Sequence, residues 1–352
     1  MNNTVLASLN SALHQAFAHD EKVYLLGEDV LDPYGGAFKV SRGLSQAFPQ
    51  RVITTPISEA GIVGVATGMA LRGLHPIVEI MFGDFLTLAA DQIINHLSKF
   101  HWMYNGQVQL PLVIRTPMGG RRGYGPTHSQ SLEKIFLGIP GLRVVAPTVF
   151  GDPGALLYDS ILKSREPVLF IENKLLYPLP VKNANDLAEF DVITTDLNNS
   201  HSPNSWNNHQ GSRMAFTVSV HGAPSPKLTL AAYGYMAELA LKALYHLAYE
   251  HEVFAELIVL TQLAPFDMSP VISSAEKTGR LLVMEESNLT LGWGAEMVAR
   301  VAEASGNHSI QFRRLAAKDF PVPASPPLEE ALFPGEEDII QASLQLSGKS
   351  KD

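Results

Sequence analysis

The chain has 352 residues, of which 46% are hydrophobic and 17% are charged, and its formal net charge is -9. This composition supports a sizeable packed core in one large or two ordinary domains, and it excludes wholesale disorder. The acidic balance, without a long basic tract, argues against nucleic-acid binding. The lack of cysteine excludes disulfides, thiolate metal sites and a cysteine nucleophile.

The first twenty residues carry neither the apolar core of a secretory signal nor an arginine-rich transit pattern. No apolar run reaches the roughly 18 residues that a transmembrane helix needs. We therefore expect a soluble, cytoplasmic protein that does not enter a membrane.

Helical periodicity alternates with short apolar runs along the first half of the chain. The pattern predicts helices at 4–20, 59–73, 85–104 and 153–164, and strands at 22–29, 51–55, 75–85, 110–117, 142–147 and 166–172. Because these strands are continuous apolar runs rather than alternating ones, we expect a parallel sheet that is covered on both faces.

The texture changes between residues 183 and 226, which include the Asn- and Ser-rich stretch DLNNSHSPNSWNNHQGS. Its polarity and lack of periodicity predict an exposed linker or insert. A second alternating series of strands and helices follows from residue 227 onward. The sequence thus predicts two α/β domains, at 1–182 and 227–352, joined by a polar segment at 183–226.

A single acid, Glu59, begins an otherwise small and apolar run in the stretch TPISEAGIVGVATGMALRG. One interpretation is a first-turn glutamate that complements the helix dipole, with Ser58 as the N-cap. The other makes Glu59 a ligand-binding acid, because glutamate is almost never fully buried without a partner. The local pattern leaves both interpretations open.

Gly61, Gly64 and Gly68 share one face of the same predicted helix, because they recur at steps of three and four. Each interior glycine costs about 1 kcal/mol relative to alanine. Such a face is compensated where another backbone or a ligand packs closely against it. Tight packing within the chain and a subunit interface beside Glu59 both fit this pattern.

A second candidate is the glycine-rich stretch RTPMGGRRGYGPTHSQS, residues 115–131, which we interpret as a long loop after a strand. Ligands of open α/β sheets bind at the carboxyl ends of the strands, so this loop is well placed for function. Its histidine, His128, is either a bystander or a general acid. Complete phosphate-loop, dinucleotide, zinc-protease and nucleophile-elbow motifs are absent from the sequence.

The ordered blocks of the chain resemble the beta subunits of the thiamine-diphosphate-dependent 2-oxo acid dehydrogenases, the pyruvate and branched-chain (2-oxoisovalerate) enzymes. The matching blocks are LLGEDV, GGAFKVSRGL, TPISEAGIVGVATGMALRGLHPIVEI, DQIINHLSKF, LPLVIRTPMGG, THSQS, PGLRVVAPT, PFD, TGRLLVMEES, GWGAEM and FPVPASPPLEEALFP. The resemblance implies a transketolase-like pyrimidine-binding domain followed by a transketolase C-terminal-like domain. It spans nearly the whole chain except the Asn-rich insert.

The resemblance also implies a role for four residues. Glu59 matches the family glutamate that hydrogen-bonds the aminopyrimidine of thiamine diphosphate, and Met81 and Phe85 match positions that pack against that ring. His128 matches the family histidine that assists acyl transfer to a lipoyl group. The implied reaction is the oxidative decarboxylation of a 2-oxo acid.

The cofactor site is incomplete in this sequence. The family of thiamine enzymes holds the diphosphate and Mg²⁺ through a G-D-G motif, whereas this chain has only GDF at Gly83 and GDP at Gly151. The resemblance therefore implies an alpha subunit that holds Mg²⁺ and shares the cofactor, with two alpha and two beta chains, while this chain supplies no metal ligand. It also implies a lipoyl-bearing acyltransferase partner and admits a structural K⁺.

The chain departs from the family pattern at two places, of which the first bears on the substrate and the second lies in the C-terminal domain. Gly138 stands where many members have histidine, and residues 259–262 (Val-Leu-Thr-Gln) replace a common aspartate-aliphatic-arginine-threonine run. Pyruvate, a branched-chain 2-oxo acid and acetoin all stay open as substrates. A non-catalytic assembly subunit of the same fold is the alternative of a different class, and a self-sufficient transketolase-like enzyme lacks its diphosphate site.

Overall fold

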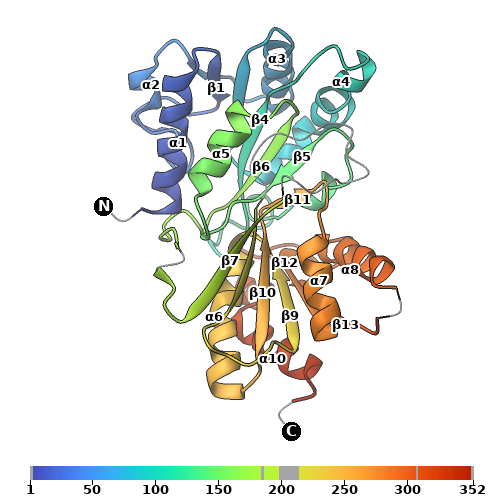
Figure 1. The fold of residues 1–352 in the computed structure, drawn as a ribbon. Coiled ribbons are helices and arrows are strands. Elements are labelled where there is room, and N and C mark those ends of the chain that lie inside the picture. Colours follow the sequence, from blue (N-terminus) through green and yellow to red (C-terminus); the bar gives the residue numbers. More distant parts are fainter. Residues whose placement is uncertain (1–2, 184–185, 198–213, 307, 350–352) are drawn as a thin grey trace.

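The computed structural model describes residues 3–183, 186–197, 214–306 and 308–349. The chain forms two layered α/β units that are stacked end to end (Figure 1). The helices, including the short 3-10 and π segments η1–η3, are α1 Val5–His19, α2 Leu44–Ala47, α3 Glu59–Leu71, η1 Gly83–Ala89, η2 Gln92–Leu97, α4 Phe100–Met103, η3 Glu133–Ile135, α5 Pro153–Leu162, α6 Gly234–His251, α7 Ser269–Thr278, α8 Trp293–Ala304, α9 Pro326–Glu330 and α10 Glu336–Leu346.

The strands are grouped in two sheets. Their bounds are β1 Val23–Gly27, β2 Val52–Thr54, β3 His75–Glu79, β4 Val113–Met118, β5 Arg143–Val145, β6 Val168–Asn173, β7 Phe190–Asp196, β8 Met214–Val220, β9 Leu228–Ala232, β10 Ala255–Leu260, β11 Gln262–Ala264, β12 Arg280–Asn288 and β13 Gln311–Ala317. None of the helices within the described ranges is long and apolar enough to cross a membrane.

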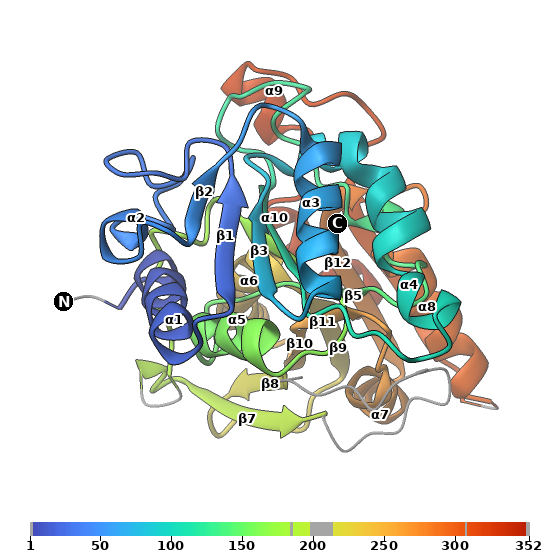
Figure 2. The ribbon, with the colours of Figure 1, turned by 90° about the horizontal axis from the view of Figure 1, so that it is seen from above.

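The first sheet has the order β11-β5-β6-β4-β3-β1-β2, and all of its neighbours are parallel except β11, which runs antiparallel to β5. Side chains of neighbouring residues in a strand pack on opposite faces of the sheet. Leu25 packs in the core beneath α1 and α5, whereas Leu26 packs in the core beneath α3. Figure 2 shows these helices on the two sides of the sheet. The predicted parallel sheet with two covered faces is thus confirmed.

The second sheet has the order β13-β12-β9-β10-β8-β7, and it is mixed. Strands β13, β12, β9 and β10 are parallel, while β8 and β7 are antiparallel. Helices α6 and α10 pack on one face, and α7 and α8 contribute to the core of the other face. Each of the two large core clusters contains residues of both sheets, so the two layered units share a continuous apolar interior.

The segment at 183–226, expected to be a polar linker, contains two strands. Residues 190–196 and 214–220 form β7 and β8, which close one edge of the second sheet. Strand β7 is largely exposed, so its polar composition masks its pairing with β8. Most of the Asn-rich stretch within this segment lies outside the described residues.

The long helix expected at 85–104 is broken into η1, η2 and α4. Segment η1 is a 3-10 helix and η2 is a π-helix, so the hydrogen-bond spacing changes at the first break. Close tertiary contacts lie at the start of η1 and at the second break. A Cβ on Gly83 would lie 2.2 Å from Met118 Cγ, and a Cβ on Gly141 would lie 2.1 Å from the carbonyl oxygen of Ser98.

Candidate active site

The candidate residues converge on the edge of the first sheet where its parallel strands end. Glu28 follows β1, Glu59 follows β2, Met81 follows β3, and His128 lies in the loop after β4. Because β2, β1, β3 and β4 are adjacent and parallel, these four segments leave the sheet at the same edge. This is the edge at which open α/β sheets bind ligands.

Glu59 is the first residue of α3, and only 5% of its surface is exposed. Ser58 occupies the N-cap position but makes no side-chain capping bond. Within the described ranges, the Glu59 carboxylate accepts no hydrogen bond and forms no ion pair. The Glu59 oxygens are not among the buried polar atoms that lack a partner, so this nearly buried residue presents its carboxylate where a ligand can reach it, which favours a ligand-binding acid over an ordinary first-turn glutamate.

A second buried carboxylate, Glu28, lies close enough to Glu59 to interact with it electrostatically. Burial raises the pKa of Glu28, and the nearby charges of Glu59 and Asp29 raise this pKa further. Its Oε1 atom has no hydrogen-bond partner among the described residues. Glu28 was not among the predicted site residues, although its position in LLGEDV, at the carboxyl end of a predicted strand, is a signal that the sequence contains.

The glycine face of α3 is open in the single chain. A Cβ on Gly68 would meet nothing within 4 Å, and one on Gly64 would meet only the Gln92 side chain at 3.6 Å. Val65, on the same side of the helix, is 60% exposed. Close intramolecular backbone packing therefore does not compensate these glycines, which leaves a subunit interface or a bound ligand as the interpretation of this face.

Phe85 and His128 come together in an aromatic cluster. The His128 ring lies 5.2 Å from the ring of Phe85 and 4.8 Å from that of Phe82, edge-on to both. His128 Nδ1 lies 2.9 Å from Thr127 Oγ1. Met81 is half-buried just before this cluster, and α3, which begins at Glu59, packs against η1, which carries Phe85. No hydrogen bond or ring contact joins Glu59 to His128 in the part of the chain that the structure describes.

The loop that carries His128 begins later than the sequence suggested. Residues 115–118 belong to β4 and are buried, and the next element, η3, begins at Glu133, so the glycine-rich loop comprises residues 119–132. The second half of the chain holds this loop through backbone N–H groups. Gly120 N donates to Glu286 Oε1 at 2.8 Å, and the N–H groups of Arg121 and Gly123 donate to the two Glu329 oxygens at 2.6 and 2.9 Å.

Replacing Glu329 with alanine is expected to loosen the glycine-rich loop. The change removes two hydrogen bonds to a carboxylate, which are worth about 1.5–3 kcal/mol each, so cleavage by trypsin after Arg121 or Arg122 should become at least about tenfold faster. Timed limited proteolysis followed by mass spectrometry measures this. Glu330→Ala, which changes the adjacent exposed glutamate, is the matched control, and equal cleavage of both variants would contradict the expectation.

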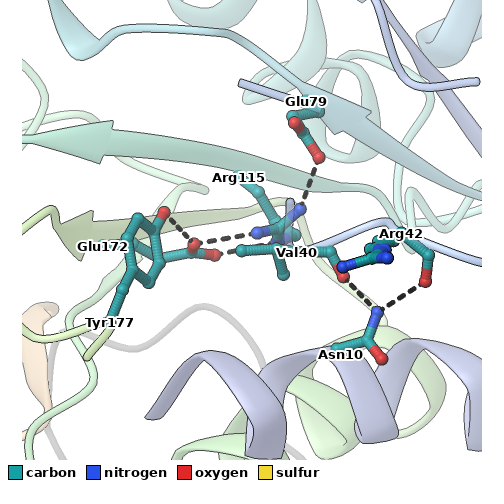
Figure 3. A network of polar contacts seen from close by, with 7 residues as sticks. All are labelled: Asn10, Val40, Arg42, Glu79, Arg115, Glu172 and Tyr177. Atoms are coloured by element: carbon teal, nitrogen blue, oxygen red, sulfur yellow. Dashed lines mark hydrogen bonds and ion pairs between the residues drawn. The ribbon is translucent and has the colours of Figure 1, made fainter. Parts of the chain in front are cut away.

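A buried ionic network lies beneath the site (Figure 3). Arg115, on β4, donates to Glu79 on β3 and, through Nε and Nη2, to both oxygens of Glu172 on β6, each at 2.8 Å. The Tyr177 hydroxyl donates to Glu172 at 2.6 Å. Burial by itself lowers the pKa of Arg115, but the two carboxylates outweigh burial and raise this pKa above its ordinary value.

The same network supports the loop that precedes β2. A Cβ on Gly36, whose φ is +79°, would lie 2.0 Å from Glu79 Oε1, so this position requires glycine. Asn10, on α1, donates to the carbonyl oxygens of Val40 and Arg42 at 2.7 and 2.9 Å, as Figure 3 also shows. The ionic network thus joins three central strands, the loop packs against its Glu79 end at Gly36, and Asn10 holds the same loop separately.

No group of three or more His, Asp or Glu side chains in the described ranges is arranged to hold a metal ion. The site edge thus offers two buried carboxylates, an aromatic cluster with one histidine, and a glycine-rich loop. This set suits an organic ligand with an apolar ring and a hydrogen-bonding nitrogen.

Comparison with known families and structures accounts for this fold. Residues 3–180 match the transketolase pyrimidine-binding domain, and residues 218–339 match the transketolase C-terminal domain. A solved structure described as a split-gene transketolase, an inactive beta4 tetramer, has a TM-score of 0.71 at 19% identity and covers 99% of this chain and 100% of its own. The fold is therefore that of the transketolase-like proteins.

Curated relatives narrow the class further. The mitochondrial pyruvate dehydrogenase E1 component subunit beta-1 of Arabidopsis thaliana is 35% identical over 99% of this chain and 90% of its own length. The pyruvate dehydrogenase E1 component subunit beta of Rickettsia bellii is 34% identical, over 97% and 98%. The acetoin:2,6-dichlorophenolindophenol oxidoreductase subunit beta of Bacillus subtilis is 33% identical, over 97% and 96%. The chain belongs to the family of beta subunits of the thiamine-diphosphate-dependent 2-oxo acid dehydrogenases.

Proposed function

We propose that this chain, together with an alpha subunit, binds thiamine diphosphate and oxidatively decarboxylates a 2-oxo acid, passing the acyl group to a lipoyl domain. The observation that carries the proposal is the buried Glu59 carboxylate, which has no hydrogen-bond partner in the described part of the chain and opens on the site edge. The class of reaction is taken from the names of the relatives that this chain resembles.

The residues at this edge fit the ring end of the cofactor. A buried carboxylate that lacks an internal partner suits the protonated or hydrogen-bonding nitrogen of an aminopyrimidine, and Met81 and Phe85 offer apolar surface beside it. Glu59 would hold a proton on that ring nitrogen, in a site where burial strengthens the interaction. When bound, thiamine diphosphate supplies a nucleophilic carbon and accepts the electron pair that decarboxylation releases.

We assign to His128 the role of donating the proton that acyl transfer requires. When the disulfide of a lipoyl group opens, one sulfur takes the acyl group and the other takes a proton, so the disulfide is reduced as the acyl unit is oxidised. An imidazolium beside the aromatic cluster can donate that proton. The half-buried position of the His128 ring leaves one side of it open to an incoming group.

We assign the diphosphate and Mg²⁺ to the alpha subunit, because the sequence lacks the G-D-G motif. The open glycine face of α3 would then be part of an assembly of two alpha and two beta chains. A structural K⁺ is admitted by the family resemblance alone. A lipoyl-bearing acyltransferase is the acceptor of this assembly.

A second candidate is an acetoin-type dehydrogenase. It is favoured by the similarity to the Bacillus subtilis acetoin subunit, which is nearly as high as the similarity to the pyruvate dehydrogenase subunits. Turnover of pyruvate, branched-chain 2-oxo acids and acetoin by the reconstituted complex separates these substrates.

Thiamine diphosphate with Mg²⁺ is expected to bind only when this chain is mixed with its alpha subunit. Calorimetric titration of the chain alone, the alpha subunit alone and the mixture measures this. Binding in the mixture that is lost on Glu59→Gln would establish a shared site. Equally tight binding to the chain alone would contradict the shared site and revive a self-sufficient transketolase-like enzyme.

A further inference from the structure

A buried lysine lies directly behind His128. Lys174 follows the carboxyl end of β6, and only 1% of its surface is exposed. Its ammonium donates a hydrogen bond to the carbonyl oxygen of His128 at 2.5 Å. Lys174 therefore links the backbone of the candidate proton donor to the end of a central strand.

Lys174 and His128 also share an aromatic neighbour. The Lys174 ammonium lies 5.2 Å from the centre of the Phe82 ring and 5.3 Å from that of the Tyr124 ring, within the range of cation–π attraction. The Phe82 ring in turn meets the His128 imidazole edge-on at 4.8 Å. One ammonium thus fixes both the main chain of His128 and the ring against which its side chain packs.

The charge on this lysine is expensive for the fold. No carboxylate of the described residues forms an ion pair with it. Charges from four segments still act on it at longer range: Asp84 on η1, Glu286 on β12 and Glu329 on α9 attract it, and Arg122 repels it. Burial outweighs these attractions and lowers the pKa of Lys174 to about 8. A methionine of similar length would fill the same space without the cost of burying a charge.

The rest of the glycine-rich loop is held on either side of this contact. Glu286 and Glu329 hold residues 120–123, and Asp84 Oδ1 accepts a hydrogen bond from Gln130 Nε2 at 2.8 Å. Lys174 holds the loop between these two sets of hydrogen bonds, at the backbone of His128 itself.

We propose that Lys174 is a positioning residue for His128, which holds the imidazole in the orientation needed for proton donation to the lipoyl group. This inference rests on the proposed function and deepens it, since neither the family resemblance nor the similar proteins assigned Lys174 a role. Lys174 itself does not touch the reacting atoms. Its effect should fall on acyl transfer and leave decarboxylation nearly unchanged.

The first test uses the chain alone and does not depend on activity. Lys174→Met should make amide hydrogen exchange in residues 125–131 at least about tenfold faster, because the hydrogen bond to a charged donor is lost. Lys318→Met is the control, since Lys318 also donates to a backbone carbonyl, that of Ala331 at 2.7 Å, but is exposed. Unchanged exchange in Lys174→Met would overturn the inference, whatever the protein catalyses.

The second test uses the reconstituted complex and separates the two half-reactions. Decarboxylation is followed with 2,6-dichlorophenolindophenol as an artificial oxidant, and acyl transfer is followed by mass spectrometry of an isolated lipoyl domain. Lys174→Met should slow acyl transfer about 10–100-fold, the usual cost of a misplaced catalytic group, with decarboxylation within about twofold of the wild type. Equal losses in both steps, or none in either, would overturn the positioning role.

The pH profile adds a readout that a purely structural role would not move. In the wild type, acyl transfer should fall as the pH rises through about 8, because Lys174 then loses the proton that makes it a charged donor. Lys174→Arg keeps its charge over this range, so the part of the fall that lies near pH 8 should be lost, while most of the rate and the fall that comes from His128 itself remain. A wild-type complex that decarboxylates none of the candidate substrates would instead refute the proposed function. The exchange experiment needs no activity, so it still tests the contact between Lys174 and His128 in that case.

Discussion

Replacing Glu59 with glutamine is expected to lower the turnover of the reconstituted complex about 10²–10⁴-fold, the range typical for loss of an acid–base group. Glutamine has nearly the same shape as glutamate but cannot share a proton with the cofactor's ring nitrogen. Because Glu59 is buried and accepts no hydrogen bond in the described part of the chain, its carboxylate contributes little to holding the fold. Steady-state rates of the complex, together with the thermal midpoint of the variant, measure both effects.

The control for this variant is Glu303→Gln, which changes an exposed glutamate on α8 far along the chain from the site edge. It should leave both turnover and the thermal midpoint unchanged. Wild-type rates for Glu59→Gln would refute the catalytic role and favour the alternative of an assembly subunit that does not catalyse. A fall in turnover accompanied by normal assembly with the alpha subunit would remove that alternative.

Local patterns were sufficient for much of this architecture. Continuous apolar runs marked β1, β3, β4 and β6, and the lone acid at the start of an apolar helix marked Glu59. The glycine-rich loop likewise marked His128. Such features depend on residues that are close in sequence, so periodicity and composition contain them. Phe85 came instead from the family resemblance, and the structure brings its ring against that of His128.

The supporting contacts were not accessible in the same way. Glu329 caps the glycine-rich loop from 208 residues away, and Lys174 reaches His128 from 46 residues away. Neither residue stands out in its local pattern, since a glutamate after prolines and a lysine after a strand are ordinary surface choices. Only the tertiary fold shows that both are buried against the loop that carries the candidate proton donor.

Arg115 illustrates how long-range pairing overrides a local reading. Arg115 lies both in the predicted strand 110–117 and at the start of the predicted loop 115–131. The structure instead buries its guanidinium inside β4, where Glu172, 57 residues later, and Glu79, 36 residues earlier, neutralise it. A planar guanidinium can satisfy two carboxylates at once, which makes a fully buried position tolerable.

Replacing Arg115 with methionine is expected to destabilise the first sheet strongly. The change leaves Glu79 and Glu172 buried without their shared cation, and breaking a buried ion pair in this way costs about 3–5 kcal/mol. At about 2–4 °C per kcal/mol for a unit of this size, the thermal midpoint should fall by about 6–20 °C. Differential scanning calorimetry of the isolated chain measures this shift.

Lys163→Met provides the comparison, because it removes a cation from a hydrogen-bonded pair of similar length in a different environment. Lys163 lies 2.7 Å from Asp159 on α5, but its side chain is 58% exposed, whereas that of Arg115 is 2% exposed. An exposed pair of this kind contributes about 0.3–0.5 kcal/mol, so its loss should shift the midpoint by less than about 2 °C. Similar shifts for the two variants would contradict the view that burial, rather than the ion pair alone, makes Arg115 essential. A large shift confined to Arg115→Met would show that the buried network stabilises the first sheet far more than an exposed ion pair stabilises a helix.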